Sequence, residues 1–383
     1  MSFARRYETK VKNLEKNEIL IRSNLKANVL GTYCSIIELM VLQKPKIPVV
    51  IVSNASNGGG AEKSMAALHQ SFLDSNIQSY LVTLNTGATK ESIPNSFALD
   101  RKWHSGLRKT LYNFIEFRKL IKELNPQVLI LNCELPELYG ALLKFNCKII
   151  CVEHSTKPWK GRKVLGAAVR LTLTTKRAKW VSVVNDKKRV WCGLGIISYI
   201  PNPYVSADLE SRTNNNFKSI TYIGGLKKDK RPEWVVLGGI KSNVNVNLFG
   251  EGVLRKELEE KYQTFSNQIK FYGFQLNPWR LISSNSLVVV PSLYEGDGMV
   301  VFEAVLSHNP ILLFNNEDLK RFKFDRQHYF NDIEELITII NSNKINDFQD
   351  LRVSEAIYNQ LLEERSLKRI SDQWINLIST TCG

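Results

Sequence analysis

Short runs of Val, Ile and Leu alternate with longer amphipathic segments along most of the chain, and this pattern predicts alternating strands and helices. A continuous apolar run is typical of a parallel strand that is buried on both faces. Such strands are predicted at 48–53, 78–84, 127–131, 148–152 and 180–184, and again at 219–223, 244–249, 269–272, 287–290 and 310–313. Helices are predicted at 62–73, 106–124, 299–306 and 353–378.

One break divides this series into two. Pro201-Asn-Pro-Tyr204 is a rigid turn, and the polar segment 208–218 is typical of a linker. The sequence therefore predicts an α/β protein with two Rossmann-like parallel-sheet domains that face each other across a cleft. We expect a basic, amphipathic prefix at 1–46, a first domain at 47–203, a second domain at 204–355 and a C-terminal helix at 356–383.

The composition is that of a globular protein long enough for two domains. Of the 383 residues, 43% are hydrophobic and 23% are charged. No uncharged apolar run reaches the ~18 residues that predict a transmembrane helix. The apolar segment 27–42 contains Glu38 and begins too late for a typical signal peptide. The six cysteines form no CxxC pair, which predicts reduced thiols in a cytosolic protein.

A net charge of +15 implies an anionic partner: nucleic acid, an acidic membrane surface or phosphorylated substrates. The stretch 157–189 holds eleven Lys or Arg residues against the single acid Asp186. The basic prefix 1–46 could lie in a membrane interface or pack on the body of the protein. No helix-turn-helix, zinc-finger or RNP-like pattern accompanies the charge, so nucleic acid is the weaker choice.

The segment from Pro291 to Glu303 carries the most specific candidate chemistry. It follows the strand at 287–290, and open α/β sheets bind ligands at the carboxyl ends of their strands. Gly296 and Gly298 allow close approach of the backbone, and Asp297 lies between them. Met299 and Val300 begin a helix whose free N–H groups favour a phosphate. Carboxylates at Glu295 and Glu303, beside such N–H groups, suit a nucleotide-sugar.

A glycine loop with Gly59 and Gly60 follows the first strand and opens a helix, which is a second candidate anion site. It is not a P-loop, because Glu62 rather than Gly precedes Lys63-Ser64. His154 lies directly after the strand at 148–152. A single histidine there is more often structural than catalytic when no other signal accompanies it.

The spacing of Glu295 and Glu303 resembles the Glu-x7-Glu signature of family 4, the retaining, nucleotide-sugar-dependent glycosyltransferases of the bacterial surface-polysaccharide type, which have the GT-B fold. The resemblance implies that Glu295 lies against the donor sugar and that Glu303 holds the ribose hydroxyls. It implies that His154 contacts the sugar from the first domain, that Gly59 and Gly60 lie at the floor of the cleft, and that the C-terminal helix crosses back onto the first domain.

The segment from Gly224 to Lys230 resembles the family's Gly-Arg-Leu-x-x-x-Lys motif, whose two cations neutralise the donor diphosphate. Lys230 matches, but Gly225 stands where the family has Arg. We expect another cation to compensate, with Arg231 the nearest candidate and Lys227 and Lys228 as alternatives. Two further segments resemble parts of the family's nucleotide pocket, one with Gly250 and Glu251 and the other with Phe274.

The resemblance implies a hexosyltransferase with Glu295, His154 and Lys230 as its catalytic residues. The donor would be a UDP- or GDP-sugar, and the acceptor a glycan or polyprenyl-diphosphate-linked glycan in lipopolysaccharide, O-antigen or capsule biosynthesis. We expect a peripheral protein on the inner face of the plasma membrane. No cofactor and no essential metal are expected, because no DxD motif stands at a strand end.

Three alternatives stay open. A GT-B protein without catalysis could bind nucleic acid, and a nucleotide-sugar epimerase could share the fold. A dinucleotide-dependent oxidoreductase is disfavoured, because GxGxxG follows neither first strand.

Overall fold

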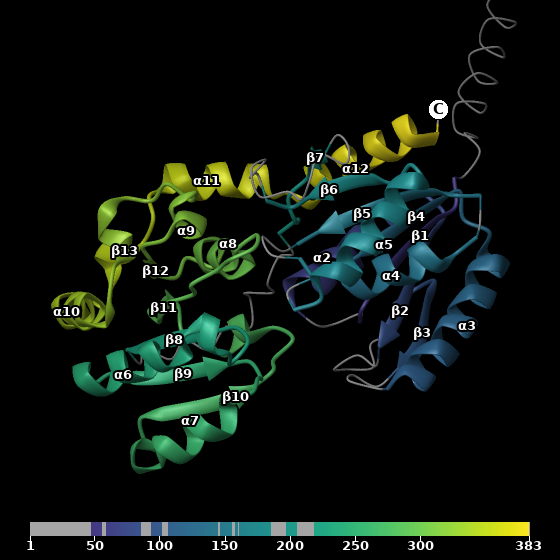
Figure 1. The fold of residues 1–383 in the computed structure, drawn as a ribbon. Helices are drawn as coiled ribbons and strands as arrows, with labels where there is room; N and C mark the ends of the chain where they lie inside the picture. Colours follow the sequence, from purple (N-terminus) through teal and green to yellow (C-terminus); the bar gives the residue numbers. More distant parts are fainter. Residues whose placement is uncertain are drawn as a thin grey trace, which may run out of the picture. The chain divides into compact units, whose positions relative to one another are not determined.

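The computed structural model describes residues 47–55, 59–85, 93–101, 106–144, 146–154, 158–159, 161–184, 197–204 and 218–382. Pro48–Gly383 form one compact unit that contains two parallel sheets (Figure 1). The predicted prefix 1–46 lies outside the described residues. Within the described ranges, no helix has both the length and the apolar character needed to cross a membrane.

The first sheet has seven strands in the order β3-β2-β1-β4-β5-β6-β7, all paired in parallel. Its strands are β1 (Val49–Ser53), β2 (Ser79–Asn85), β3 (Ser96–Arg101), β4 (Val128–Asn132), β5 (Lys148–Glu153), β6 (Lys179–Ser182) and β7 (Ile197–Tyr199). The connecting helices are α2 (Gly60–Asp74), α3 (Leu107–Leu124), α4 (Glu134–Leu142) and α5 (Lys163–Thr175).

The second sheet has six parallel strands in the order β10-β9-β8-β11-β12-β13. Its strands are β8 (Ser219–Ile223), β9 (Asn245–Phe249), β10 (Ile269–Gly273), β11 (Leu287–Val290), β12 (Ile311–Phe314) and β13 (Tyr329–Phe330). The helices are α6 (Pro232–Ser242), α7 (Arg255–Lys261), α8 (Met299–Leu306), α9 (Glu317–Lys320), α10 (Ile333–Asn343), α11 (Glu355–Glu364) and α12 (Leu367–Cys382).

The two parallel-sheet domains predicted from the sequence are confirmed. Three strands were not predicted: the edge strand β3, which is largely exposed, and the short strands β7 and β13. The helix predicted at 353–378 is two helices, because the chain leaves the helical conformation between α11 and α12.

Continuous apolar runs form the central strands because both faces of each sheet are covered. Along β11, Leu287 and Val289 pack in one hydrophobic cluster, whereas Val288 and Val290 pack in the cluster on the opposite face. Successive strand residues point to opposite faces, so a run without polar alternation is what such a strand needs.

The strand order sets where a ligand can bind. In the first sheet β1 lies between β2 and β4, and in the second sheet β8 lies between β9 and β11. Helical connections leave to opposite sides at these two points, and the crevice at the carboxyl ends of the strands is the usual ligand site. The predicted site residues lie in the loops that follow β1, β5, β8, β9, β10 and β11, or at the start of the helices after those loops.

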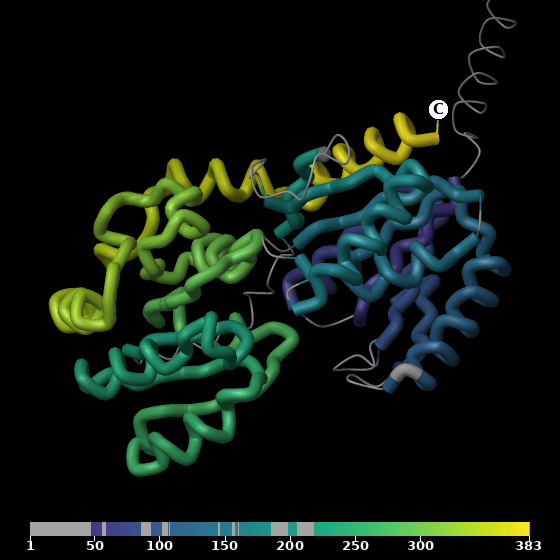
Figure 2. Tube along the Cα trace, viewed as in Figure 1, coloured from purple at the N-terminus to yellow at the C-terminus, as the bar shows by residue number. Residues whose placement is uncertain are grey.

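The C-terminal helices join the two domains. The helix α11 packs against α8 of the second domain, and α12 packs against α2 of the first (Figures 1 and 2). Lys179 Nζ donates to the carbonyl of Thr380 at 3.2 Å, and Tyr204 N donates to the carbonyl of Arg365 at 2.7 Å. Arg365 therefore lies where both connections between the domains meet.

A buried ion pair stands at this junction. Arg365 Nη1 donates to both carboxylate oxygens of Asp297, at 2.8 and 2.7 Å, and to the Asn202 carbonyl at 3.1 Å. The side chains of Arg365 and Asp297 are only 7% and 5% exposed. The guanidinium also lies 3.7 Å from the centroid of the Phe302 ring.

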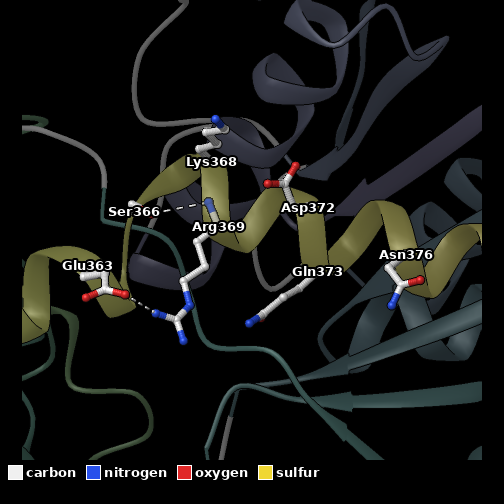
Figure 3. Close-up of a pocket in the computed structure, with 7 residues that line it drawn as sticks. All are labelled: Glu363, Ser366, Lys368, Arg369, Asp372, Gln373 and Asn376. Atoms are coloured by element: carbon white, nitrogen blue, oxygen red, sulfur yellow. Dashed lines mark hydrogen bonds and ion pairs between the residues drawn. The ribbon is translucent and has the colours of Figure 1, made fainter.

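Replacing Arg365 with Met should lower the free energy of unfolding by about 3–5 kcal/mol, because the Asp297 carboxylate would stay buried without its cation. Chemical denaturation measures this change. Arg369→Met is the matched control: Arg369 pairs with Glu363 on the surface (Figure 3), at 48% and 81% exposure. That pair should be worth no more than about 1 kcal/mol. Equal losses in the two variants would contradict a special role for the Arg365 pair.

Candidate active site

The loop between β11 and α8 places backbone donors at the carboxyl end of the second sheet. Gly298 precedes α8 with a φ of +73°, a left-handed conformation that favours glycine. Within the described part of the chain, no side chain caps the N-terminus of α8. The N–H groups of Met299 and Val300 therefore belong to a helix start without a side-chain acceptor, which attracts an anion.

Glu295 and Lys230 are brought together from two loops of the second domain. The Lys230 ammonium donates to the Glu295 carboxylate and, at 3.1 Å, to the Tyr294 carbonyl. The Asp318 carboxylate holds the loop by accepting from Glu295 N at 3.0 Å. The side chains of Glu295 and Lys230 are 16% and 27% exposed, so both remain accessible to a ligand.

Glu303 lies in the second turn of α8 and is half-buried. Trp279 Nε1 donates to Glu303 Oε2 at 3.1 Å. Burial raises the pKa of Glu303, and the positive charge of Lys63 and the Trp279 hydrogen bond oppose that rise. Glu303 is thus oriented by an indole and faces a cation that comes from the first domain.

Asp297 is directed to the domain junction. Its oxygens accept from Arg365, and Oδ2 also accepts from Asn202 N at 3.2 Å. The sequence placed Asp297 among the donor-binding residues. In the structure, the observed partners of its carboxylate are Arg365 and Asn202, and its position fixes the loop between Glu295 and Gly298.

His154 reaches this loop from the first domain, directly after β5. Its Nδ1 lies 3.5 Å from Asn202 Nδ2; with that amide as the donor, His154 Nε2 carries the proton. Among the described residues, Nε2 has no hydrogen-bond partner although it is buried. Burial lowers the pKa of His154 to about 4, so the ring is neutral at pH 7. A buried N–H donor without a partner suits a ligand hydroxyl.

Gly296 lies against His154. A Cβ on Gly296 would stand 2.3 Å from the His154 carbonyl oxygen, so a larger residue would push the loop away from the first domain. The sequence predicted that both residues belong to one site, and the structure brings them together.

The glycine loop of the first domain also meets α8. A Cβ on Gly60 would stand 2.9 Å from Met299 Cγ, so the N-termini of α2 and α8 lie close together. Gly59 is the N-cap of α2. Burial raises the pKa of Glu62, and backbone N–H groups of Glu62 and Gly59 oppose the rise, as in a capping box. Gly58 lies outside the described residues.

Arg231 was the nearest candidate in the sequence for the cation that compensates for Gly225, but Lys227 is the cation that lies against this glycine. The Arg231 guanidinium lies over the rings of Trp234 and Phe314, at 4.2 and 4.5 Å from their centroids. Lys227 is exposed, and its Cε and Cδ would lie 3.5 and 3.7 Å from a Cβ on Gly225. The Lys227 side chain therefore runs over the position where the family motif has its Arg.

The remaining predicted residues line the same edge of the sheet. Gly250 has a φ of +133°, and a Cβ there would stand 1.9 Å from the Gly224 carbonyl oxygen, so only glycine allows these loops to pack. The Glu251 side chain is 54% exposed and pairs with Arg255. Phe274 is half-buried just after β10.

Several residues of the site carry no local sequence signal. Trp279 and Arg365 contact Glu303 and Asp297 across 24 and 68 positions. Lys63 was visible beside the glycine loop, but it lacks the context of a P-loop. The contact that Lys63 makes with Leu276 of the second domain is visible only in the structure.

A shallow hollow of about 510 Å³ lies elsewhere, along α11 and α12 (Figure 3). It is lined by polar and charged side chains, and no predicted site residue is among them: Glu363, Ser366, Lys368, Arg369, Asp372, Gln373 and Asn376. Within the described ranges, no group of three or more His, Cys, Asp or Glu side chains is arranged to hold a metal ion.

The basic stretch 157–189 is only partly a surface feature. Arg170 is buried and pairs with Glu137 and Glu153. Lys176 Nζ donates to three carbonyls at and just beyond the end of α4, which stabilises that helix terminus. Arg162 and Lys163 are exposed at the start of α5. Lys157, Lys160 and 185–189 lie outside the described residues.

The known sequences to which this chain is similar are glycosyltransferases. The family model for glycosyl transferases group 1 matches residues 209–322, which include Lys230, Glu295 and Glu303. A poly(ribitol-phosphate) alpha-N-acetylglucosaminyltransferase of Staphylococcus aureus is 25% identical over 150 residues, covering 36% of this chain and 29% of that protein. The matched part thus spans less than a third of that relative.

Two further proteins are similar over more of the chain. An uncharacterized glycosyltransferase of Haemophilus influenzae is 24% identical over 303 residues, covering 74% of this chain and 85% of that protein. The structure of Anabaena HepE in complex with UDP and glucose matches with a TM-score of 0.71 at 15% identity, covering 87% of this chain and 100% of that one. The fold is GT-B, and the comparisons support a glycosyltransferase.

Proposed function

We propose that this protein is a retaining glycosyltransferase of family 4 that moves a sugar from a UDP- or GDP-linked donor to a glycan or lipid-linked glycan. One observation carries the proposal: Glu295, Glu303 and His154 all surround the N-terminus of α8, and the N-terminus of α2 faces it. Two helix starts supply N–H groups for phosphates, and the acids and His154 supply partners for hydroxyls.

The similar structure of HepE holds UDP and glucose, which supports a nucleotide-sugar donor. In our proposal Glu303 accepts from the ribose hydroxyls, and Glu295 and the His154 Nε2–H contact the sugar. Lys230 and the first turn of α8 stabilise the diphosphate as it departs. The charge that develops in the reaction is met by groups that the fold already holds in place.

The proposed reaction proceeds on one face of the sugar. The bond from the anomeric carbon to the diphosphate oxygen breaks, and the acceptor oxygen bonds to that carbon from the same side. The acceptor proton passes to the departing diphosphate oxygen. Because Glu295 is paired with Lys230, its carboxylate is better suited to holding the sugar than to attacking the anomeric carbon.

Glu303→Gln should lower kcat/KM for the donor by about 10–100-fold, because a neutral amide replaces a charged acceptor of ribose hydroxyls. Release of nucleoside diphosphate from UDP- and GDP-sugars, with and without EDTA, measures this. Glu363→Gln, on the exposed face of α11, is the control and should leave the rate unchanged. Full activity of the Glu303 variant would remove this residue from the donor site, and loss of wild-type activity in EDTA would contradict metal independence.

We propose Lys227 as the cation that compensates for Gly225, since its methylene groups already lie over that glycine. Lys227→Ala should lower kcat by about 10²–10³-fold, the usual effect of losing a preorganised charge at a leaving group. Arg231→Ala should have a smaller effect, because that guanidinium stacks on two rings. Steady-state kinetics of both variants decide the assignment. A large loss in the Arg231 variant alone would return the role to Arg231.

We also propose that the first domain docks on the inner face of the plasma membrane in surface-polysaccharide synthesis. Support comes from α5, where Val164 and Leu171 are 86% and 58% exposed beside Arg162 and Lys163. Exposed apolar side chains flanked by basic ones favour an anionic interface.

Val164→Glu should reduce binding to vesicles that contain anionic phosphatidylglycerol several-fold, as measured by co-sedimentation, because a carboxylate would enter the interface. Val253→Glu is the matched control, since Val253 is 84% exposed on the second domain. Equal effects of the two changes would argue against docking through α5. If deletion of residues 1–46 releases the protein from the vesicles and Val164→Glu does not, the prefix is the anchor.

A further inference from the structure

Lys63 is a side chain of the first domain that reaches into the second. It lies in the first turns of α2, and its Nζ donates to the carbonyl of Leu276 at 2.7 Å, across 213 positions of sequence. Leu276 belongs to the loop after β10, three residues beyond the end of that strand. The contact therefore ties the glycine loop of one domain to a loop at the ligand-binding edge of the other.

Helix stability does not explain a lysine at this place. The N-terminus of a helix carries a partial positive charge, so a cation in its first turns is unfavourable by a few tenths of a kcal/mol or more. The N-terminus of α8 lies close by, since Gly60 packs on Met299. The position of Lys63 is therefore better explained by its contact with the second domain than by the stability of α2.

The same ammonium acts on Glu303. Lys63 is the charged group that opposes the rise in the pKa of Glu303 caused by burial, and Trp279 Nε1 donates to that carboxylate at 3.1 Å. Lys63 thus favours the ionised form of Glu303, the form that accepts hydrogen bonds from two hydroxyl groups. Trp279 lies three residues after Leu276. The contact of Lys63 with Leu276, the contact of Trp279 with Glu303 and the effect of Lys63 on Glu303 therefore all belong to one small region.

The ammonium retains donors for a ligand. A lysine has three N–H groups, and within the described ranges Lys63 forms one hydrogen bond, to Leu276. Two N–H groups are left, close enough to the Glu303 carboxylate for the Lys63 charge to act on it, and next to the loop after β10. Hydroxyls that lie between an ammonium and a carboxylate can donate to one and accept from the other, which is the pattern that a ribose diol offers.

We propose that Lys63 is a positioning residue for the nucleoside part of the donor: it orients Glu303 and closes the nucleoside site from the first domain. This inference rests on the proposed function of Glu303. It makes nucleotide affinity depend on a contact between the two domains, so a nucleoside diphosphate would hold the domains together when it binds.

Isothermal titration with UDP and with GDP tests the proposal on the full chain. Lys63→Met should weaken binding of the preferred nucleotide by about 10-fold or more, because a charged hydrogen-bond donor is lost. Lys63→Arg should restore affinity to within about 3-fold, since it keeps the cation. Lys122→Met on α3 is the control for the loss of one exposed lysine and should bind like wild type.

A double-mutant cycle separates positioning from a merely structural role. If Lys63 acts through Glu303, adding Lys63→Met to Glu303→Gln should change affinity by less than about 2-fold. Losses that multiply in the double variant would show that Lys63 acts independently of Glu303, which overturns the proposal. So would wild-type affinity in Lys63→Met. Both results leave the proposed function standing if Glu303→Gln alone is impaired, whereas a wild-type protein that binds neither nucleotide overturns both.

Discussion

The buried pair between Asp297 and Arg365 is the constraint on which the site depends. It holds Asp297, which lies near the end of the loop between β11 and α8, two residues after Glu295 and two before Met299. Asn202 also contacts this pair, through its amide and its carbonyl, and it lies at the connection between the domains. The ion pair therefore holds the loop that carries Glu295 against the junction of the two domains.

The parallel topology explains why the candidate site needs only a few charged side chains. Strands β1, β8 and β11 lie at the points where the strand order of each sheet reverses, so the loops after them open at the edge where α/β sheets usually bind ligands. The helices α2 and α8 then start from those loops and present N–H groups. In the proposed reaction, the charged side chains add what the backbone cannot: partners for hydroxyl groups and a counter-charge for a leaving group. Such an arrangement suits group transfer that relies on placement and electrostatics.

The sequence predicted the parts of the molecule that depend on local pattern. Apolar runs located the central strands, and Glu295 and Glu303 could be proposed as a pair because one strand-loop-helix unit contains both. The break at Arg365 was missed because no proline or glycine marks it, and the bend follows from packing on two domains. The partners of Asp297 and Lys63 are 68 and 213 positions away, and no local pattern records such distances. Lys227 was one of three candidates for the cation that compensates for Gly225, and only the path of its side chain over this glycine distinguishes it.

A crystal structure of the protein with the nucleoside diphosphate that it binds best would show whether the edge of the second sheet is the donor site. We expect the ribose hydroxyls within hydrogen-bond distance of the Glu303 carboxylate, and the phosphates at the first turn of α8 beside Lys230. A nucleotide bound elsewhere, with the Glu303 carboxylate contacting only protein, would rule this site out.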